Sequence, residues 1–471
     1  MKRVLQTTAL FLLTIGYANA SSHSPQLGTL YNRAAKFHGP GRNPVIVIPG
    51  ILGSNLKDRA SGRIVWGGFT HNYASPSSPV GARLFAIPME SGKALSALRD
   101  DVVPDGALSR IRLSLLGVPV QLNAYREILL SLGAGGYTDE DLAKAGAINY
   151  GPQHFTCFQF DYDWRRENSE NAKLLHEFIL EKRRYVQNEL RRRYGTPDVD
   201  VRFDLIAHSM GGLIARYYLE YGAEQLPDDG SVPPLTWAGA RYVDRAILVG
   251  TPNAGSAKAF EQLIIGVRLA PILPKYSAAV IGTLPSVYEL LPRPRHHAIV
   301  DAATQTPIDV LDPAIWEKNG WGLADPAQDR ELQVLLPEIA SASERRAVAL
   351  NHLRKCLRHT KQFFAALDTP AHPPDGTSLY LMAGDADLMP AIIAIDSHHH
   401  VKTIESAAGD GTVVRTSALM DERVGGKWTP ELRSPIAWTH TMFFFRNHLG
   451  LTKDPAFTDN LLFILLEQQR R

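Results

Sequence analysis

The chain has 471 residues, of which 45% are hydrophobic and 21% charged, and its formal net charge is +2. This composition is that of a globular protein and excludes a disordered or low-complexity chain. The first twenty residues hold two of the 50 basic residues and none of the 48 acidic ones, so the rest of the chain is formally neutral, which argues against a strong electrostatic attraction to nucleic acid or to an anionic membrane.

Residues 1–20, MKRVLQTTALFLLTIGYANA, have the order of a secretory signal peptide. Lys2 and Arg3 are followed by the apolar run Ala9–Tyr17 and by the small-x-small site Ala18–Ala20. A short buried helix is the alternative interpretation. We expect cleavage, and a mature chain of residues 21–471 in a periplasm or outside the cell. No later apolar run reaches the roughly 18 residues of a membrane span.

Several short apolar runs, rich in β-branched residues, are typical of strands buried on both faces. These runs are residues 44–49, Val199–Ala207, Ala246–Val249 and Ser378–Met382. Helical patterns cover Lys173–Tyr194 and Gly212–Tyr221. Buried strands separated by helices predict an α/β fold with a mostly parallel sheet that has helices on both sides.

A long segment, about residues 256–376, separates two of the predicted strands. It exceeds an ordinary α/β connection and contains apolar stretches broken by Pro and Gly. A separate domain is one interpretation. An inserted cap over the carboxyl edge of the sheet is better supported, because a strand of the sheet follows the segment.

Ser209 stands between a predicted strand and a predicted helix in the stretch FDLIAHSMGG. A strained turn of this kind requires small residues two before and two after the serine, and Ala207 and Gly211 occupy those positions. The helix that follows directs N–H groups and the positive end of its dipole at the hydroxyl. A helix N-cap serine is the alternative. The pattern predicts a nucleophile, provided that partners exist.

Acyl transfer by serine needs a base and an orienting carboxylate, which in this type of fold follow in the order Ser, acid, His. Asp410, in a Gly-Asp-Gly turn, and His440 fit that order. Asp385 and Asp387 are competing acids just past a strand, and His448 is a competing base. We favour Asp410 and His440.

The first predicted strand supplies an oxyanion donor. In VIPGILGSNL the chain turns at residues 49–50 and leaves the N–H of Ile51 free to donate. The N–H of Met210, directly after the nucleophile, is the expected second donor.

Five stretches, in this order, resemble the lecithin:cholesterol acyltransferase family of α/β-hydrolases. They are PVIVIPGILGSNL at 44–56, FDYDWRR at 160–166, AHSMG at 207–211, VGTPNAGS at 249–256 and GDGTVVRTSAL at 409–419. The resemblance implies an α/β-hydrolase domain over residues 21–471, with Ser209, Asp410 and His440 as the catalytic triad. It also implies backbone donors at Ile51 and Met210, and a structural role for Tyr162–Arg165.

Two departures from the family limit what can be transferred. The lid disulfide of animal members has no counterpart here; the stretch VWGGFTHNY at 65–73 keeps Trp66 and Phe69, which either contact lipid or belong to the core. The cap sequence is too different for substrate contacts to be transferred. Cys157 and Cys356 allow at most one disulfide bridge, and the sequence leaves it open.

The resulting hypothesis is a serine-dependent lipid ester hydrolase or O-acyltransferase, acting through an acyl-enzyme on phospholipid or a related ester at a membrane or lipid-particle surface. A secreted triacylglycerol lipase or carboxylesterase is the first alternative, and a non-catalytic lipid-binding protein the second. We expect no cofactor, because no nucleotide-binding glycine loop is present. We also expect no metal, since the adjacent side chains of His398–His400 point in different directions.

Overall fold

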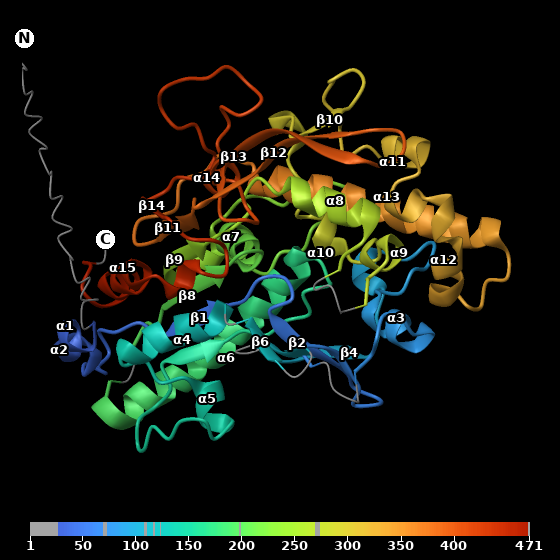
Figure 1. Cartoon of the computed structure of the whole chain (residues 1–471). Helices are drawn as coiled ribbons and strands as arrows, with labels where there is room; N and C mark the ends of the chain where they lie inside the picture. Colours follow the sequence, from blue (N-terminus) through green and yellow to red (C-terminus); the bar gives the residue numbers. More distant parts are fainter. Residues whose placement is uncertain are drawn as a thin grey trace, which may run out of the picture.

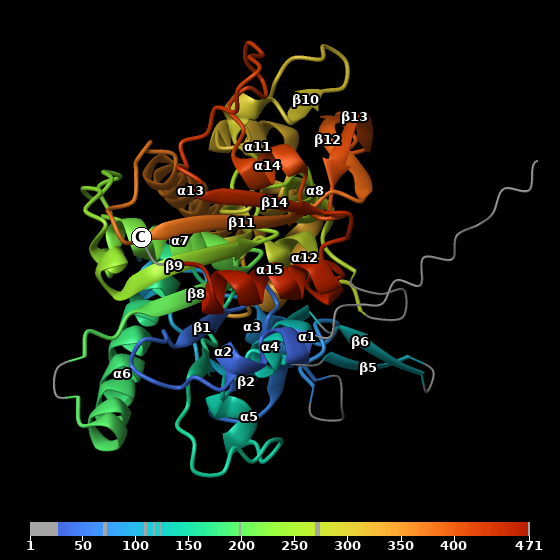
Figure 2. The ribbon, with the colours of Figure 1, turned by 90° about the vertical axis from the view of Figure 1, so that its left-hand side faces the viewer.

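The computed structural model describes residues 27–68, 73–107, 111–115, 118–122, 124–196, 199–268 and 274–469. Its centre is a six-stranded sheet in the order β14-β11-β9-β8-β1-β7 (Figures 1 and 2). The strands are β1 Val45–Ile48, β7 Cys157–Gln159, β8 Phe203–His208, β9 Val243–Val249, β11 Ser378–Gly384 and β14 His440–Phe444. All neighbouring pairs are parallel, which confirms the predicted sheet.

Successive side chains of each strand enter two different cores, one on either face of the sheet. Ile46 and Ile48 of β1 belong to the larger core, whereas Val45 and Val47 belong to the smaller one. Strand residues alternate between faces with a period of two. A strand buried on both sides therefore reads as the continuous apolar run seen in the sequence.

Helices cover both faces of the sheet. The larger core is covered by α6 Asn168–Tyr194, α7 Gly211–Tyr221 and α13 Ala342–Leu367, and the smaller one by α4 Ala124–Ala134 and α15 Pro455–Leu466. Figure 2 shows α4 and α15 together on the side that faces the viewer. This arrangement is the α/β-hydrolase architecture.

The segment between β9 and β11 shares the larger core with the sheet. It contains α8 Ala257–Ile265, α9 Ala278–Ile281, α10 Pro285–Tyr288, α11 Pro313–Asn319, α12 Asp329–Leu335 and α13. Phe260, Trp316 and Trp321 of this segment are buried in the same cluster as the strand residues. α13 then returns to the sheet, where Phe363 stacks on Tyr217 of α7 with ring centroids 5.6 Å apart.

Three smaller sheets complete the described structure. β10 Ile299–Asp301, β12 Asp387–Ile395 and β13 Val401–Gly409 form one, in which β12 and β13 are an antiparallel hairpin. The others comprise β2 Ser54–Asp58, β3 Ile64–Trp66 and β4 Val102–Ala107, and β5 Ile111–Leu115 with β6 Val118–Leu122. The remaining helices are α1 Leu27–Leu30, α2 Asn32–Ala35, α3 Pro79–Phe85, α5 Glu140–Lys144 and α14 Arg415–Leu419.

The two cysteines are both buried and unbridged. Cys157 lies in the smaller core and donates its S–H to Asp139 Oδ2 at 3.2 Å, while Cys356 lies in the larger core across the sheet. In the part of the chain that the structure describes, no helix has the length and apolar character needed to cross a membrane. The expected signal peptide, residues 1–20, and Phe69 lie outside the described residues.

Candidate active site

Ser209 lies in a strained turn between β8 and α7. Its φ is 54°, in the left-handed region that residues with a side chain rarely adopt, and its N–H donates to Val249 O at 2.8 Å. A Cβ on Gly211 would lie 2.4 Å from Pro49 O, and one on Gly212 would lie 1.9 Å from Thr251 Oγ1. Only glycine therefore allows the start of α7 to approach its neighbours this closely, as a nucleophile turn requires.

The loop after β1 passes beside the serine. A Cβ on Gly50 would lie 2.7 Å from Ser209 Cβ. Leu52 has a φ of 64°, and Gly53 donates its N–H to Gly50 O at 3.0 Å, so the loop forms a tight turn. Within the described residues, the N–H groups of Ile51 and Met210 make no hydrogen bond. Two unpaired backbone donors beside a serine are what an oxyanion hole needs.

Asp410 is held in the turn that follows β13. Its side chain is 1% exposed; Oδ1 accepts the N–H groups of Thr412 at 2.9 Å and Val413 at 2.7 Å. Its Oδ2 accepts Nδ1–H of His448 at 2.7 Å, and Asp410 O accepts the His448 N–H at 2.6 Å. This pair fixes the imidazole tautomer and leaves Nε2 of His448 with its lone pair free.

His440 does not reach this site, so the histidine expected from the sequence is corrected. It is the exposed first residue of β14 and is paired with Tyr380 near the start of β11. Because the strands are parallel, their first residues lie at the opposite edge of the sheet from Ser209, which follows the last residue of β8. His448 follows the end of β14 and therefore lies at the correct edge.

His448 and Ser209 border the same turn after β9. Ser209 is hydrogen-bonded to Val249, and a Cβ on the next residue, Gly250, would lie 3.1 Å from Nδ1 of His448 and 3.3 Å from Oδ2 of Asp410. The ring centroid of His208, the residue before the serine, lies 4.8 Å from the ring centroid of His448. The structure thus brings Ser209, Asp410 and His448 to one region.

The competing acids lie elsewhere. Asp385 forms an ion pair with Arg415 at 2.9 Å, and Asp387 is exposed at the start of β12. Neither contacts a histidine among the described contacts, so Asp410 is the acid that the geometry supports.

A buried polar chain that has no sequence motif supports the loop and the serine turn. Gly50 donates its N–H to the Tyr125 hydroxyl at 2.7 Å, and that hydroxyl lies 3.3 Å from Nδ1 of His208. Burial, followed by the neighbouring His448, lowers the pKa of His208 to about 3. His208 is therefore neutral and positions its neighbours rather than acting as a second base. Tyr125 was not identified from the sequence, because only the fold brings α4 to this loop.

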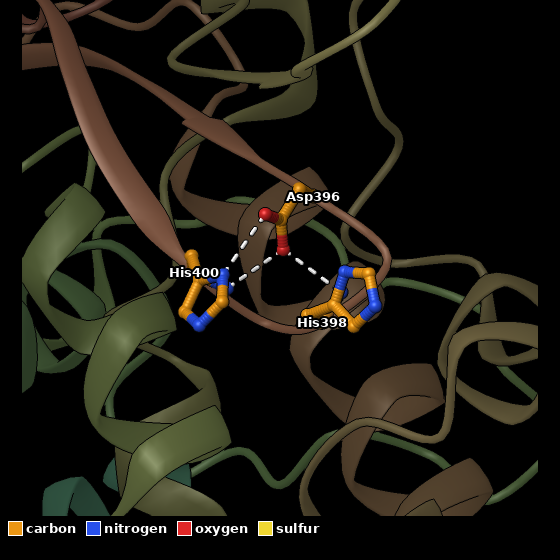
Figure 3. Close-up of side chains that lie close together, drawn as sticks. All are labelled: Asp396, His398 and His400. Carbon is orange, nitrogen blue, oxygen red and sulfur yellow. Dashed lines mark hydrogen bonds and ion pairs between the residues drawn. The ribbon is translucent and has the colours of Figure 1, made fainter.

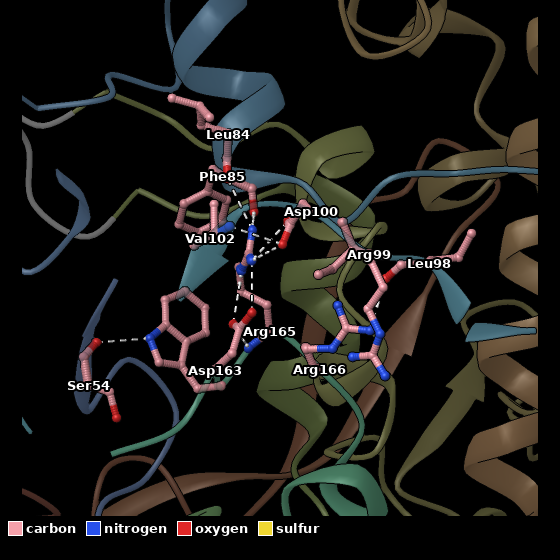
Figure 4. A network of polar contacts seen from close by, with 12 residues as sticks. Ser54, Leu84, Phe85, Leu98, Arg99, Asp100, Val102, Asp163, Arg165 and Arg166 are labelled. Carbon is pink, nitrogen blue, oxygen red and sulfur yellow. Dashed lines mark hydrogen bonds and ion pairs between the residues drawn. The ribbon is translucent and has the colours of Figure 1, made fainter. Parts of the chain in front are cut away.

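The FDYDWRR stretch braces the loop from the other side, as predicted. Tyr162 donates its hydroxyl to Pro49 O at 2.7 Å, and Trp164 donates Nε1–H to Ser54 O at 3.1 Å. Arg165, fully buried, binds Asp163 at 2.8 Å and Asp100 at 2.9 Å (Figure 4). The same guanidinium donates to the carbonyls of residues 84 and 85 and so joins α3 to the brace, while Trp164 joins the brace to β2.

A cavity of about 230 Å³ opens beside Ser209. Its walls are mainly aromatic and aliphatic, and they come from the loop after β1, from β3 and α3, and from helices α8 to α10. They include Ile51, Leu52, Trp66, Phe85, Trp164, Tyr276, Ile281, Leu284, Val287 and Leu290. Trp66 is thus a buried wall residue. Lys258 lines this cavity and also a wider groove of about 830 Å³ along β12 and β13.

Comparison with known proteins agrees with this architecture. A family model described as "Lecithin:cholesterol acyltransferase" matches residues 142–319, which include β7, the Ser209 turn and β9. No curated protein matches significantly.

Among solved structures, that of the Tle4–Tli4 complex matches with a TM-score of 0.54 and 16% identity, over 90% of this chain and 98% of that one. Phospholipase PlaB from Legionella pneumophila matches with 16% identity and a TM-score of 0.26. That match covers 64% of this chain and 44% of the PlaB chain. The lin2722 product from Listeria innocua has 10% identity, 91% and 95% coverage, and a TM-score of 0.28. These last two scores are too low to compare architecture. The parallel sheet thus has the α/β-hydrolase fold, and the part of the chain that contains the Ser209 turn is similar to the lecithin:cholesterol acyltransferase family.

Proposed function

We propose that the protein is a lipid ester hydrolase or O-acyltransferase that works through an acyl-enzyme on Ser209. The observation that carries this proposal is the apolar cavity that begins at Ser209, at the edge of the sheet where the buried Asp410–His448 pair also lies. An ester whose acyl chain enters the cavity presents its carbonyl to the serine. The family match supports chemistry at an ester bond.

In the first step, Nε2 of His448 accepts the Ser209 proton while Oγ attacks the ester carbonyl. Asp410, bound to Nδ1–H, stabilises the imidazolium that forms. The N–H groups of Ile51 and Met210 donate to the oxyanion of the tetrahedral intermediate. His448 then returns the proton to the leaving alcohol, and the acyl group stays on Ser209.

In the second step, water or another alcohol attacks the acyl-enzyme, and His448 again takes up and returns a proton. With water the product is a free fatty acid, and with an alcohol it is a new ester. The choice depends on how well the cap excludes water from the acyl-enzyme. The same residues thus serve both hydrolysis and transfer.

We propose a phospholipid as the acyl donor. The cavity of about 230 Å³ is smaller than the roughly 300–1,000 Å³ of sites that hold an entire drug-sized ligand, so it suits part of one acyl chain. The ammonium group of Lys258, at the junction with the wider groove, supplies a positive charge for a phosphate outside the cavity. A triacylglycerol or simple carboxylic ester would use the same triad but would not need that charge.

The test is incubation of the protein and of a Ser209→Ala control with phospholipid vesicles, with and without a sterol, followed by separation of the lipid products. Fatty acid and lysophospholipid alone would identify a phospholipase, and added steryl ester an acyltransferase. Turnover of triacylglycerol or short esters without phospholipid turnover would favour the lipase alternative. If the folded protein turns over no ester and does not react with a fluorophosphonate, the proposal of an enzyme is wrong. That result would favour a lipid-binding protein.

A further inference from the structure

The tip of the β12–β13 hairpin brings together three metal-binding side chains that the active site does not use. The turn has the sequence Asp396-Ser397-His398-His399-His400, between the last residue of β12 and the first of β13. One possible ligand atom from each of Asp396, His398 and His400 lies within 4.8 Å of the other two. Figure 3 shows the carboxylate between the two imidazoles.

The backbone of the turn is already ordered around the carboxylate. Asp396 Oδ1 accepts the N–H groups of His398 at 2.8 Å and His400 at 2.9 Å. Oδ2 lies 3.0 Å from Nδ1 of His400. The rings of His398 and His400 lie side by side, with centroids 6.0 Å apart and planes 24° from parallel. The turn therefore presents the carboxylate and the two rings on one side.

His399 is directed the other way. Its φ is 64°, and its Nε2 lies 2.8 Å from the carbonyl oxygen of Asn319, the last residue of α11. Adjacent side chains of the three consecutive histidines therefore point in different directions, whereas His398 and His400 lie on the same side of the turn. Asp396, which lies just before the histidine run, supplies the third possible ligand.

We propose that Asp396, His398 and His400 bind one divalent transition-metal ion, with Zn²⁺ as the best match. Two imidazoles and a carboxylate are typical ligands of Zn²⁺, whereas Mg²⁺ and Ca²⁺ prefer oxygen alone. Tetrahedral bonds of about 2.0–2.1 Å place ligand atoms roughly 3.3 Å apart. The exposed rings of His398 and His400 need only small rotations to reach that spacing. Water completes the coordination.

The ion would act on structure and not on the reacting ester. β12 and β13 have nine residues each, and Asp410 follows the far end of β13, so the site is roughly 27 Å along the hairpin from the acid. Through His399 and the pairing of β10 with β12, the tip is joined to the cap. A bound ion would hold the hairpin ends together and stabilise this contact.

The test is calorimetric titration of tag-free, metal-stripped protein with Zn²⁺, using His398→Ala, His400→Ala and His399→Ala. The last variant is a matched control, since it removes a histidine from the same turn that does not face the site. We expect one equivalent to bind the wild type and His399→Ala, and binding at least about tenfold weaker in the other two. We also expect Zn²⁺ to raise the Tm of the wild type by about 2 °C or more, and that of His398→Ala much less.

Binding that all three variants share equally would mean that other surface groups take up the ion, and would overturn the proposal. So would equal loss in His399→Ala, or no saturation at one equivalent. Ester turnover requires no contribution from this turn, so it serves as the control for folding in every variant. A wild type that binds no metal but has normal ester turnover would overturn the metal proposal without affecting the proposed function.

Discussion

The histidine that pairs with Asp410 is the side chain on which the proposed chemistry depends most. We expect His448→Ala to lower kcat for a short p-nitrophenyl ester by about a thousandfold or more, because the proton acceptor is lost and the neighbouring His208, whose pKa is lowered to about 3 mainly by burial, is too weak a base to replace it. His440→Ala should change kcat less than about twofold, since the exposed His440 lies at the other edge of the sheet. Steady-state kinetics of the two variants beside Ser209→Ala will decide. A large loss in His440→Ala would contradict the assignment.

The Tyr125 hydroxyl is predicted to support the loop after β1, which carries the Ile51 N–H. Tyr125→Phe would leave the Gly50 N–H and Nδ1 of His208 without a partner, so we expect a loss of about 1–3 kcal/mol in the free energy of unfolding. We also expect kcat to fall with KM nearly unchanged, because the loop carries the Ile51 donor.

Tyr217→Phe is the matched control for this prediction, since its hydroxyl donates to Glu224 O at 3.0 Å away from the serine turn. It should cost stability but leave kcat unchanged. Urea denaturation and steady-state kinetics measure both quantities. If the two variants reduced kcat equally, Tyr125 would have only a structural role.

A largely buried, ion-paired histidine joins three elements and should make stability depend on pH. His359 of α13 lies 3.2 Å from Glu167, just before α6, and 3.1 Å from Glu289, just after α10. Burial alone would lower the pKa of His359, but the two carboxylates, with a smaller contribution from Asp228, raise it to about 9.

Because the folded pKa lies above the unfolded value of 6.5, the charged form stabilises the fold fully below pH 6.5, and this contribution is lost as the pH rises through 9. It amounts to about 3 kcal/mol at most. Urea denaturation at pH 6, 7.5 and 9.5 should show a difference between the wild type and His359→Gln that shrinks toward high pH. A constant difference would mean that His359 is neutral.

The Arg165 brace is predicted to matter more for folding than any exposed ion pair near it. Arg165→Met leaves Asp163 and Asp100 without their buried partner, and we expect it to cost about 3–5 kcal/mol of the free energy of unfolding. Arg99→Met removes an exposed partner of Glu170 and should cost less than about 1 kcal/mol. Thermal or chemical denaturation compares them. Similar losses would mean that water reaches the Arg165 network.

The elements with strong sequence patterns were predictable, and those with weak patterns were not. The buried runs that became β1, β8, β9 and β11 were identified because burial on both faces demands apolar side chains at every position. β7 has only three residues, and the run around Met442 was not assigned to the sheet. Placing the last strand too early made His440 look like a loop residue after the sheet, although it is the first residue of β14.

At the site, the positions set by the local backbone were the predictable ones. Ser209 and the two N–H donors follow from turns whose glycines are visible in the sequence. Asp410 follows from its Gly-Asp-Gly turn. The partners that come from distant parts of the chain, His448 and Tyr125, depend on which strand ends meet at one edge of the sheet. That information is in the packing and not in any short motif.

The cavity beside Ser209 exists only because the sheet and the segment between β9 and β11 share one core. Its wall combines the loop after β1, residues of β3 and α3, and helices α8 to α10. If the cavity holds the acyl chain as proposed, its depth should set the chain-length preference for ester substrates. Val287, which lines the cavity from α10, is buried. Val287→Phe extends a larger side chain into existing space, which limits the cost of overpacking to about 1–3 kcal/mol.

We expect this variant to lower kcat/KM for octanoyl and longer esters by about tenfold or more, because each CH₂ group that is kept out of the cavity forfeits about 0.8 kcal/mol of burial. The acetyl ester should react at nearly the wild-type rate, and this comparison within a single variant serves as the control for folding and for the triad. A uniform loss across p-nitrophenyl acetate, butyrate, octanoate and palmitate would show that the acyl chain binds elsewhere. The groove along β12 and β13 would then be the next candidate, since it adjoins the cavity at Ser256 and Lys258.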